Sequence, residues 1–431
     1  MQNELNGLIS LLKKSTSPYF TVREALNILT AEGGFAELPA SGAWRLEKGG
    51  KYCVNVFGKL LIAFTVGSEY APGDGFRLAA SHIDWPCYYI KPDPEQVQAG
   101  CVKLSVEPYG GMIHSTWLDR PLSAAGVVTL RSENVLAPER RLVDFGRPVL
   151  TIPSLAIHLN REVNKGVAYN PNKDMLPLCA AVEKEFNKEG FFLKKLAEQL
   201  GAAPEDILSY DLCLYNAEEP VLCGFDGDFL TSPRLDNITS TYAVLYGITH
   251  CERKRGVSAA ILFDNEEVGS GTKQGADSAT LGLVLEKISL ALGADRSEHI
   301  DALTGGFMLS CDVAHAKHPN HADMADGTSA SELNRGVSIK MNYEQRYATE
   351  AAGIAVIEGI CKKYGIPYQR YMNRPDLRGG GTLGSYAASQ LGMSTADVGV
   401  PMLAMHSCRE TMGAKDQAAL NDLVQKYYSE E

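Results

Sequence analysis

The chain has 431 residues, of which 45% are hydrophobic, and a formal net charge of −11. This length allows more than one large core and indicates a globular protein of two or three domains. The acidic balance leaves no basic stripe for phosphate contacts, which argues against nucleic acid as a partner. With no apolar run of about 18 residues, we also expect no membrane span.

The N-terminal residues and the cysteines indicate the compartment. The first twenty residues are amphipathic and lack the basic segment, long apolar core and small-residue cleavage site of an export signal. The ten cysteines are scattered without a C-x-x-C pair, unlike a disulfide framework or a thiolate zinc site. We therefore expect reduced, buried thiols and a cytoplasmic protein.

The first part of the chain predicts helices and then strands. Apolar residues recur at helical spacing over 8–31, and Ser17-Pro18 marks a turn between two short helices. Between 51 and 111, short runs rich in β-branched or aromatic residues are bounded by Gly or Pro, which predicts strands. From about Asp236, helical patterns alternate with apolar strands, as in a mostly parallel sheet covered by helices.

The middle of the chain follows neither pattern. It contains one predicted helix, rich in acidic and basic residues, over 179–201, with strands on either side. We interpret 88–232 as an inserted, β-rich domain. The expected fold is therefore α/β, with a main domain formed by 1–87 and 233–431 around a mixed, mostly parallel sheet covered by helices.

Four apolar runs end in side chains that can bind metal. FRLAAS precedes His82, AAILFDN precedes Glu266 and Glu267, GFMLSC precedes Asp312, and PMLAM precedes His406. In open α/β sheets, ligands bind outside the carboxyl ends of the strands, so residues far apart in sequence can meet there. The pattern predicts one metal site built from several strand ends.

Each of these residues also has a simpler interpretation. His82 alone is as easily a strand-end residue, but Asp84 lies two positions on, where it can accept a hydrogen bond from the other imidazole nitrogen. Glu266 and Glu267 alone resemble a solvated turn, yet one could bind metal while the other acts as general base. Asp236 opens a predicted helix and alone is better explained as an N-cap.

Two further motifs invite other functions. His315, His318 and His321 resemble a compact zinc site, but Pro319 prevents one continuous helical face, which weakens that interpretation. The glycines of 379–384 match G-x-G-x-x-G, the basis for a nicotinamide-dependent oxidoreductase. No apolar strand leads into them, so a flexible active-site loop is the better interpretation.

Eight segments in order resemble the aspartyl aminopeptidase family of metallopeptidases. They are SHIDWPCYYIKP, VEPYGG with WLDRPLSAAG, IPSLAIHLNREVN, SPRLDN, LFDNEEVGSGTKQGADS, SCDVAHAKHPN, IKMNYEQRYAT and PMLAMHSCRE. The resemblance implies a metal-dependent aminopeptidase that acts on peptides. It further implies that 88–232 is a dimerisation domain and that dimers assemble into tetrahedral homododecamers.

The resemblance also implies roles for individual residues. The implied metal ligands are His82, Asp236, Glu267, Asp312 and His406, with Asp236 bridging two ions. Glu266 becomes the general base, and Asp84 supports His82. The residues implied to contact substrate are His158, reaching into a neighbouring subunit, His315, Lys340 and Tyr347. Imidazole and carboxylate ligands favour two zinc ions per chain, although cobalt and manganese also suit them.

One departure from the family pattern concerns specificity. Many relatives read H-T-D-S-P where this chain has HIDWP at 82–86, which places larger apolar groups beside the ligands. A preference for acidic N-terminal residues therefore stays open. The alternatives are another two-metal exopeptidase that prefers neutral residues and a catalytically silent homologue.

Overall fold

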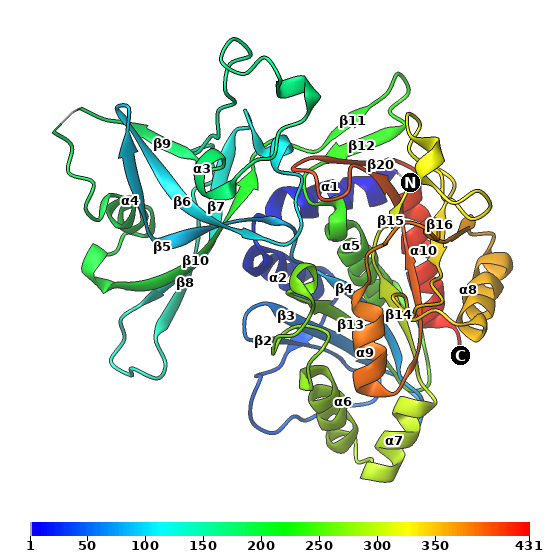
Figure 1. Cartoon of the computed structure of the whole chain (residues 1–431). Coiled ribbons are helices and arrows are strands. Elements are labelled where there is room, and N and C mark those ends of the chain that lie inside the picture. Colours follow the sequence, from blue (N-terminus) through cyan, green and yellow to red (C-terminus); the bar gives the residue numbers. More distant parts are fainter. Residues whose placement is uncertain (1, 184) are drawn as a thin grey trace.

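The computed structural model describes residues 2–183 and 185–431. Within these residues the strands form three sheets of nine, six and five strands. Figure 1 shows the largest sheet between helices, with the six-stranded sheet to one side of it. None of the described helices combines the length and apolar character that crossing a bilayer requires.

The nine-stranded sheet carries most of the predicted strand ends. Its spatial order is β1 (Ala36–Glu37), β2 (Lys51–Val56), β3 (Leu60–Val66), β13 (Val257–Phe263), β4 (Arg77–His82), β14 (Phe307–Cys311), β18 (Ser394–Gly399), β16 (Val337–Lys340) and β17 (Tyr368–Tyr371). Five neighbouring pairs are parallel and three are antiparallel. The prediction of a mixed, mostly parallel sheet is confirmed.

Helices cover both faces of this sheet. The described α-helices are α1 (Gln2–Lys14), α2 (Pro18–Asn27), α3 (Pro171–Asp174), α4 (Phe191–Leu200), α5 (Leu235–His250), α6 (Thr280–Ala291), α7 (Arg296–Thr304), α8 (Ala351–Tyr364), α9 (Leu383–Leu391) and α10 (Asp416–Ser429). Of these, α3 and α4 contact the six-stranded sheet instead. Successive side chains of a strand face opposite sides. Ala79 of β4 accordingly belongs to the hydrophobic core that α1, α5, α8 and α10 also enter, whereas Leu78 and Ala80 belong to the core that α6, α7 and α9 enter.

The two predicted N-terminal helices are confirmed as α1 and α2. Ser17 caps α2, because its hydroxyl accepts a hydrogen bond from the backbone N–H of Phe20 at 3.4 Å. Pro18 occupies the first turn, where its missing N–H costs nothing. The turn expected at Ser17-Pro18 is therefore a helix start.

The six-stranded sheet is antiparallel throughout. Its order is β8 (Glu139–Asp144), β7 (Leu122–Leu130), β10 (Ile207–Asn216), β5 (Cys87–Gln98), β6 (Cys101–Tyr109) and β9 (Leu178–Ala181). The helix predicted over 179–201 is wrong in its first half. Residues Leu178–Ala181 instead pair with the edge of β6, and α4 begins only after Gly190, whose φ is +63°.

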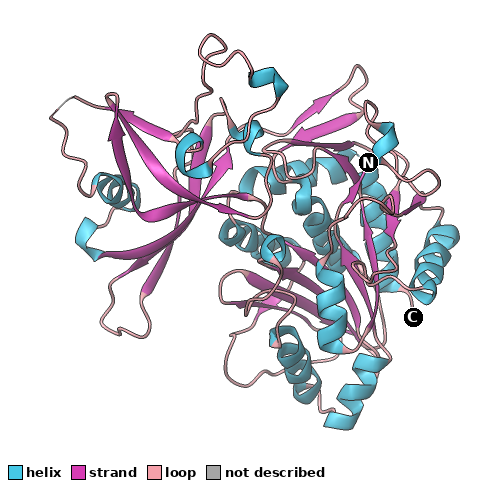
Figure 2. Ribbon diagram, viewed as in Figure 1, coloured by secondary structure: helices cyan, strands magenta, loops and turns pink. Residues whose placement is uncertain are grey.

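The five-stranded sheet combines two strands that follow the six-stranded sheet in sequence with three strands from the C-terminal part of the chain. Its order is β11 (Val221–Cys223), β12 (Phe229–Ser232), β20 (Glu410–Gly413), β19 (Pro401–Leu403) and β15 (Ala314–His315). In Figure 2, viewed as in Figure 1, β11 and β12 lie above helix α1. The loop between β19 and β20 carries His406, so this predicted ligand comes from a different sheet than the other strand-end residues.

Candidate active site

Three strand ends of the nine-stranded sheet meet at one edge. His82 ends β4, Glu266 and Glu267 follow β13, and Asp312 follows β14. Because β4 lies between β13 and β14 and is parallel to both, the carboxyl ends of all three strands point to the same edge. The sheet topology therefore brings these four side chains together, as the strand-end pattern predicted.

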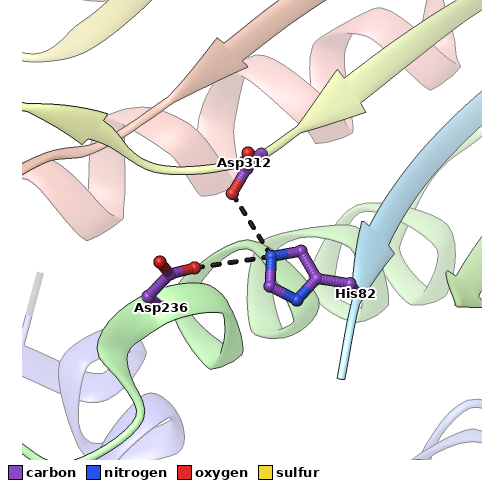
Figure 3. Close-up of side chains that lie close together, drawn as sticks. All are labelled: His82, Asp236 and Asp312. Atoms are coloured by element: carbon purple, nitrogen blue, oxygen red, sulfur yellow. Dashed lines mark ion pairs between the residues drawn. The ribbon is translucent and has the colours of Figure 1, made fainter. Parts of the chain in front are cut away.

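His82 lies at the centre of the first group of side chains (Figure 3). Its Nε2 atom is 3.4 Å from Oδ1 of Asp236 and 3.4 Å from Oδ1 of Asp312. The other ring nitrogen, Nδ1, is 3.1 Å from the carbonyl oxygen of Asp84 and 3.4 Å from its Oδ1. The contacts of Nδ1 with Asp84 fix the orientation of the ring, so that Nε2 faces the two carboxylates.

His406 lies at the centre of the second group. Its Nε2 atom is 3.4 Å from Oδ2 of Asp236 and 3.3 Å from Oε2 of Glu267. Its Nδ1 is 2.8 Å from the carbonyl oxygen of Gly111. His406 has a φ of +65°, a left-handed conformation that turns the loop so that the ring faces the strand ends.

Asp236 belongs to both groups, with one carboxylate oxygen toward each histidine. Helix α5 starts at Leu235, but Asp236 has φ −79° and ψ 107°, outside the helical region. Its side chain points across the site rather than capping the helix. The N-cap alternative for Asp236 does not describe this geometry.

The site concentrates negative charge in a buried place. Burial raises the pKa of Glu266 to about 8, and the carboxylates of Asp312, Asp84 and Asp236 add to this against the effect of His82. Burial lowers the pKa of His406, but Asp236 and Glu267 outweigh it and raise that pKa to about 10. More acidic groups converge here than the two imidazoles can neutralise.

This surplus of buried carboxylate fits a site for metal cations. Oδ1 of Asp236 and Oε1 of Glu267 are buried without a hydrogen-bond partner among the described residues. Ligand atoms of His82, Asp236 and Asp312 lie within 4.8 Å of one another, as do those of Asp236, Glu267 and His406. Imidazole nitrogen with carboxylate oxygen is a donor set that zinc accepts.

Asp84 holds the backbone of the strand-end glutamates. Its Oδ1 accepts a hydrogen bond from the N–H of Glu266 and its Oδ2 from the N–H of Glu267, both at 3.1 Å. The hydroxyl of Tyr109 donates to the same Oδ2 at 2.6 Å and accepts from Nδ2 of Asn265 at 2.8 Å. Asp84 thus supports His82 and both glutamates at once.

Two residues of the site were not predicted from the sequence. Tyr109 ends β6 of the six-stranded sheet. Glu410 accepts hydrogen bonds from the backbone N–H of Asp236 at 3.0 Å and of His406 at 2.8 Å. Neither residue follows an apolar run of the nine-stranded sheet, so the strand-end pattern gives no signal for them. A carboxylate four positions after His406 was the only hint of Glu410.

A cavity of about 320 Å³ opens from the two groups. In addition to Glu266 and the residues of the two groups, its lining includes His315, Lys340, Tyr347 and the glycines at 380–381. Nζ of Lys340 donates to the carbonyl oxygen of Val313 at 2.8 Å and to Oδ2 of Asp312 at 3.3 Å, and it lies 4.8 Å from the centre of the Tyr347 ring. The structure therefore gathers three of the four predicted substrate residues here.

Gly399 lets the neighbouring strand reach Asp312. A Cβ atom at this glycine would lie 1.9 Å from the carbonyl oxygen of Asp312, a separation that real atoms do not adopt. The end of β18 can therefore pack directly against the backbone of this predicted ligand.

Of the four predicted substrate residues, His158 is the one that lies outside this cavity. His158 is exposed on the loop between β8 and α3 and is not among the residues that line it. His315, His318 and His321 do not form a group with metal-binding spacing among the described residues. The glycine segment lines the cavity, as expected of an active-site loop, and it leads into α9 rather than following a strand of the sheet.

Comparisons with known proteins agree over nearly the whole chain. The sequence model of the Aminopeptidase I zinc metalloprotease (M18) family matches residues 11–428. The chain is 42% identical, over 433 residues that cover 100% of both proteins, to a probable M18 family aminopeptidase 2 from Clostridium acetobutylicum.

Solved structures share the fold. One, a cryo-EM structure of the Ape4 and Nbr1 complex, matches with a TM-score of 0.95 and 32% identity over 99% of this chain and 85% of the other. Another, an mApe1 dodecamer from S. cerevisiae, matches with a TM-score of 0.85 and 26% identity over 99% of this chain and 97% of the other.

Proposed function

This chain belongs to the M18 family of zinc aminopeptidases, and on that premise we propose that it removes N-terminal residues from peptides with two zinc ions. The observation that carries the proposal is that Asp236 is shared by two groups of ligand atoms. His82 and Asp312 complete one group, and Glu267 and His406 complete the other. A carboxylate with one oxygen in each group suits a bridge between two cations.

Zinc ions bound there supply Lewis acidity, which polarises a scissile carbonyl and lowers the pKa of water. Glu266 lines the same cavity and lies outside the two groups that share Asp236, and its carboxylate is also within 4.8 Å of ligand atoms of His82 and Glu267. Its carboxylate can take a proton from water and pass it to the leaving amine, which is the work of a general base and acid. Asp84 fixes the backbone from which Glu266 projects.

We propose a preference for acidic N-terminal residues, with Lys340 as its source. Among the described residues, Lys340 is the one lysine or arginine that lines the cavity, and its side chain is only 2% exposed. Burial opposes its charge, but the carboxylate of Asp312 outweighs this and raises the pKa of Lys340. A buried cation in the pocket favours a substrate carboxylate over a neutral side chain.

Self-association is the remaining part of the proposal. We propose a homododecamer, which the solved mApe1 dodecamer supports. We further propose that it is built from dimers and that 88–232 is the dimerisation domain. The loop that carries His158 also exposes Leu155 by 59%, Ile157 by 46% and Leu159 by 74%. Apolar side chains clustered on an exposed loop are typical of a contact surface. We propose that this loop delivers His158 to the active site of a neighbouring subunit.

The test combines metal analysis with a panel of aminoacyl p-nitroanilides, assayed with and without a chelator. We expect zinc in the purified protein, hydrolysis that the chelator abolishes, and resistance of N-acetylated peptides. Faster hydrolysis of neutral than acidic aminoacyl substrates would support the two-metal exopeptidase with neutral preference. Zinc content without any hydrolysis would identify the silent homologue.

A further inference from the structure

A second cavity, of about 250 Å³, lies beyond His315. It is lined by loop residues that follow β15 and β17. Its basic and imidazole lining residues are His315, Lys317, His318, His321, Arg374 and Arg378. None of these residues belongs to the two groups of ligand atoms that share Asp236.

The two cavities share a wall. His315 lines both of them, and the glycine segment borders the second cavity at Gly379 and the first at 380–381. Hydrogen bonds also connect the two linings: the Tyr371 hydroxyl of the second cavity donates to Oδ1 of Asn373 at 2.6 Å, and Nδ2 of Asn373 donates to the hydroxyl of Tyr347, which lines the first, at 3.2 Å. The second cavity therefore lies next to the one that would hold the first residue of a peptide.

The second cavity is positively charged, in contrast to the chain as a whole, whose net charge is −11. Lys317 and Arg378 are exposed and form no ion pair with any other described residue. Arg374 is paired with Asp376. Asp326 is the one carboxylate among the lining residues, and it accepts hydrogen bonds from the backbone N–H groups of Thr328 and Ser329. Lys317 and Arg378, which form no ion pair with the described residues, outnumber this one carboxylate.

We propose that this cavity binds a carboxylate carried by the part of the peptide that follows the first residue. The inference rests on the proposed aminopeptidase function. Lys317 and Arg378 supply the charge, because unpaired cations in a cleft attract an anion more strongly than the same groups on an open surface. Two sources share this chemistry: the C-terminal carboxylate of a short peptide and an Asp or Glu side chain further along a longer one.

The test compares tripeptides that differ only in this carboxylate. One pair has a free or an amidated C-terminus, and the other carries Asp or Asn at the third position of an amidated peptide. We expect the carboxylate member of at least one pair to have a kcat/KM about three- to tenfold higher, as two partly solvated ion pairs would produce. The pair that responds identifies the source of the carboxylate.

The variant for this test is Lys317→Met combined with Arg378→Gln, in the full-length protein. We expect it to lose the carboxylate advantage, measured as a ratio to the kcat/KM of an aminoacyl p-nitroanilide. The control is Arg45→Gln with Lys48→Met, two exposed residues before β2, toward the opposite edge of the sheet from β17. The control should keep the advantage.

Two results would overturn the inference: no discrimination by the wild-type enzyme in either pair, or full discrimination in the Lys317 and Arg378 variant. Both can be told apart from failure of the proposed function. A wild-type protein that cleaves neither p-nitroanilides nor peptides with a free N-terminus contradicts aminopeptidase activity itself. A protein that cleaves both without regard to the carboxylate contradicts only the assignment of the second cavity.

Discussion

Replacing Tyr109 with Phe should weaken zinc binding although Tyr109 itself is not a proposed ligand. Its hydroxyl donates to Oδ2 of Asp84 at 2.6 Å and accepts from Asn265 at 2.8 Å. The Asp84 carboxylate in turn lies 3.4 Å from Nδ1 of His82 and accepts hydrogen bonds from the backbone N–H groups of Glu266 and Glu267. The substitution removes one oxygen atom and leaves the ring to fill the same space.

The magnitude follows from the bond that is lost. A hydrogen bond to a charged group contributes about 1.5–3 kcal/mol. At about 1.4 kcal/mol for each tenfold change in affinity, loss of this bond corresponds to a roughly 10- to 100-fold weaker zinc affinity. Removing partners that orient metal ligands in other proteins has effects of about this size.

The assay measures competition for zinc between a chromophoric chelator and protein from which a chelator has first removed the metal. Tyr210→Phe is the matched control, because the Tyr210 hydroxyl donates to the carbonyl oxygens of Lys91 and Pro92 in the same six-stranded sheet, away from the site. This control should lose about 1 kcal/mol of stability and keep its zinc affinity. Equal zinc affinities for Tyr109→Phe and wild type would refute the proposed support of Asp84 by Tyr109.

Three other substitutions test separate parts of the site. Glu266→Gln should abolish turnover while metal analysis still finds the wild-type zinc content; an active variant would remove Glu266 as general base. Lys340→Ala should lower the ratio of kcat/KM for substrates with N-terminal Asp to that for substrates with N-terminal Leu roughly tenfold. An unchanged ratio would contradict Lys340 as the source of an acidic preference. Glu410→Gln should weaken zinc binding about tenfold in the same competition assay, because one of the two oxygens that accept from the backbone N–H groups of Asp236 and His406 is replaced by a donor; unaltered binding would speak against this role.

The sequence predicts those parts of the site that depend on strand direction. His82, Glu266 and Asp312 follow apolar runs, and parallel pairing of β4, β13 and β14 is enough to bring their side chains to one edge. His406 also follows an apolar run, but β19 pairs with β15 and β20 in a different sheet. Its arrival at the same place depends on how the two sheets pack, which a local pattern does not contain.

Residues whose positions depend on distant contacts were harder to predict. An Asp at a helix start is typical of an N-cap, and only the contacts of Asp236 with His82 and His406 distinguish a shared ligand from a cap. Tyr109 and Glu410 act through hydrogen bonds to segments far away in sequence. The first half of the helix predicted over 179–201 is wrong for a related reason, since pairing with β6 overrode the local preference at Leu178–Ala181.

Zinc titration of the chelated protein tests the two-ion proposal most directly. Bound zinc and hydrolysis of a peptide with a free N-terminus are measured at each addition. We expect two zinc ions per chain, with hydrolysis reaching its maximum only as the second ion binds, because Asp236 is shared by two ligand groups. Full activity with one zinc ion per chain, and no further binding, would contradict the two-zinc site.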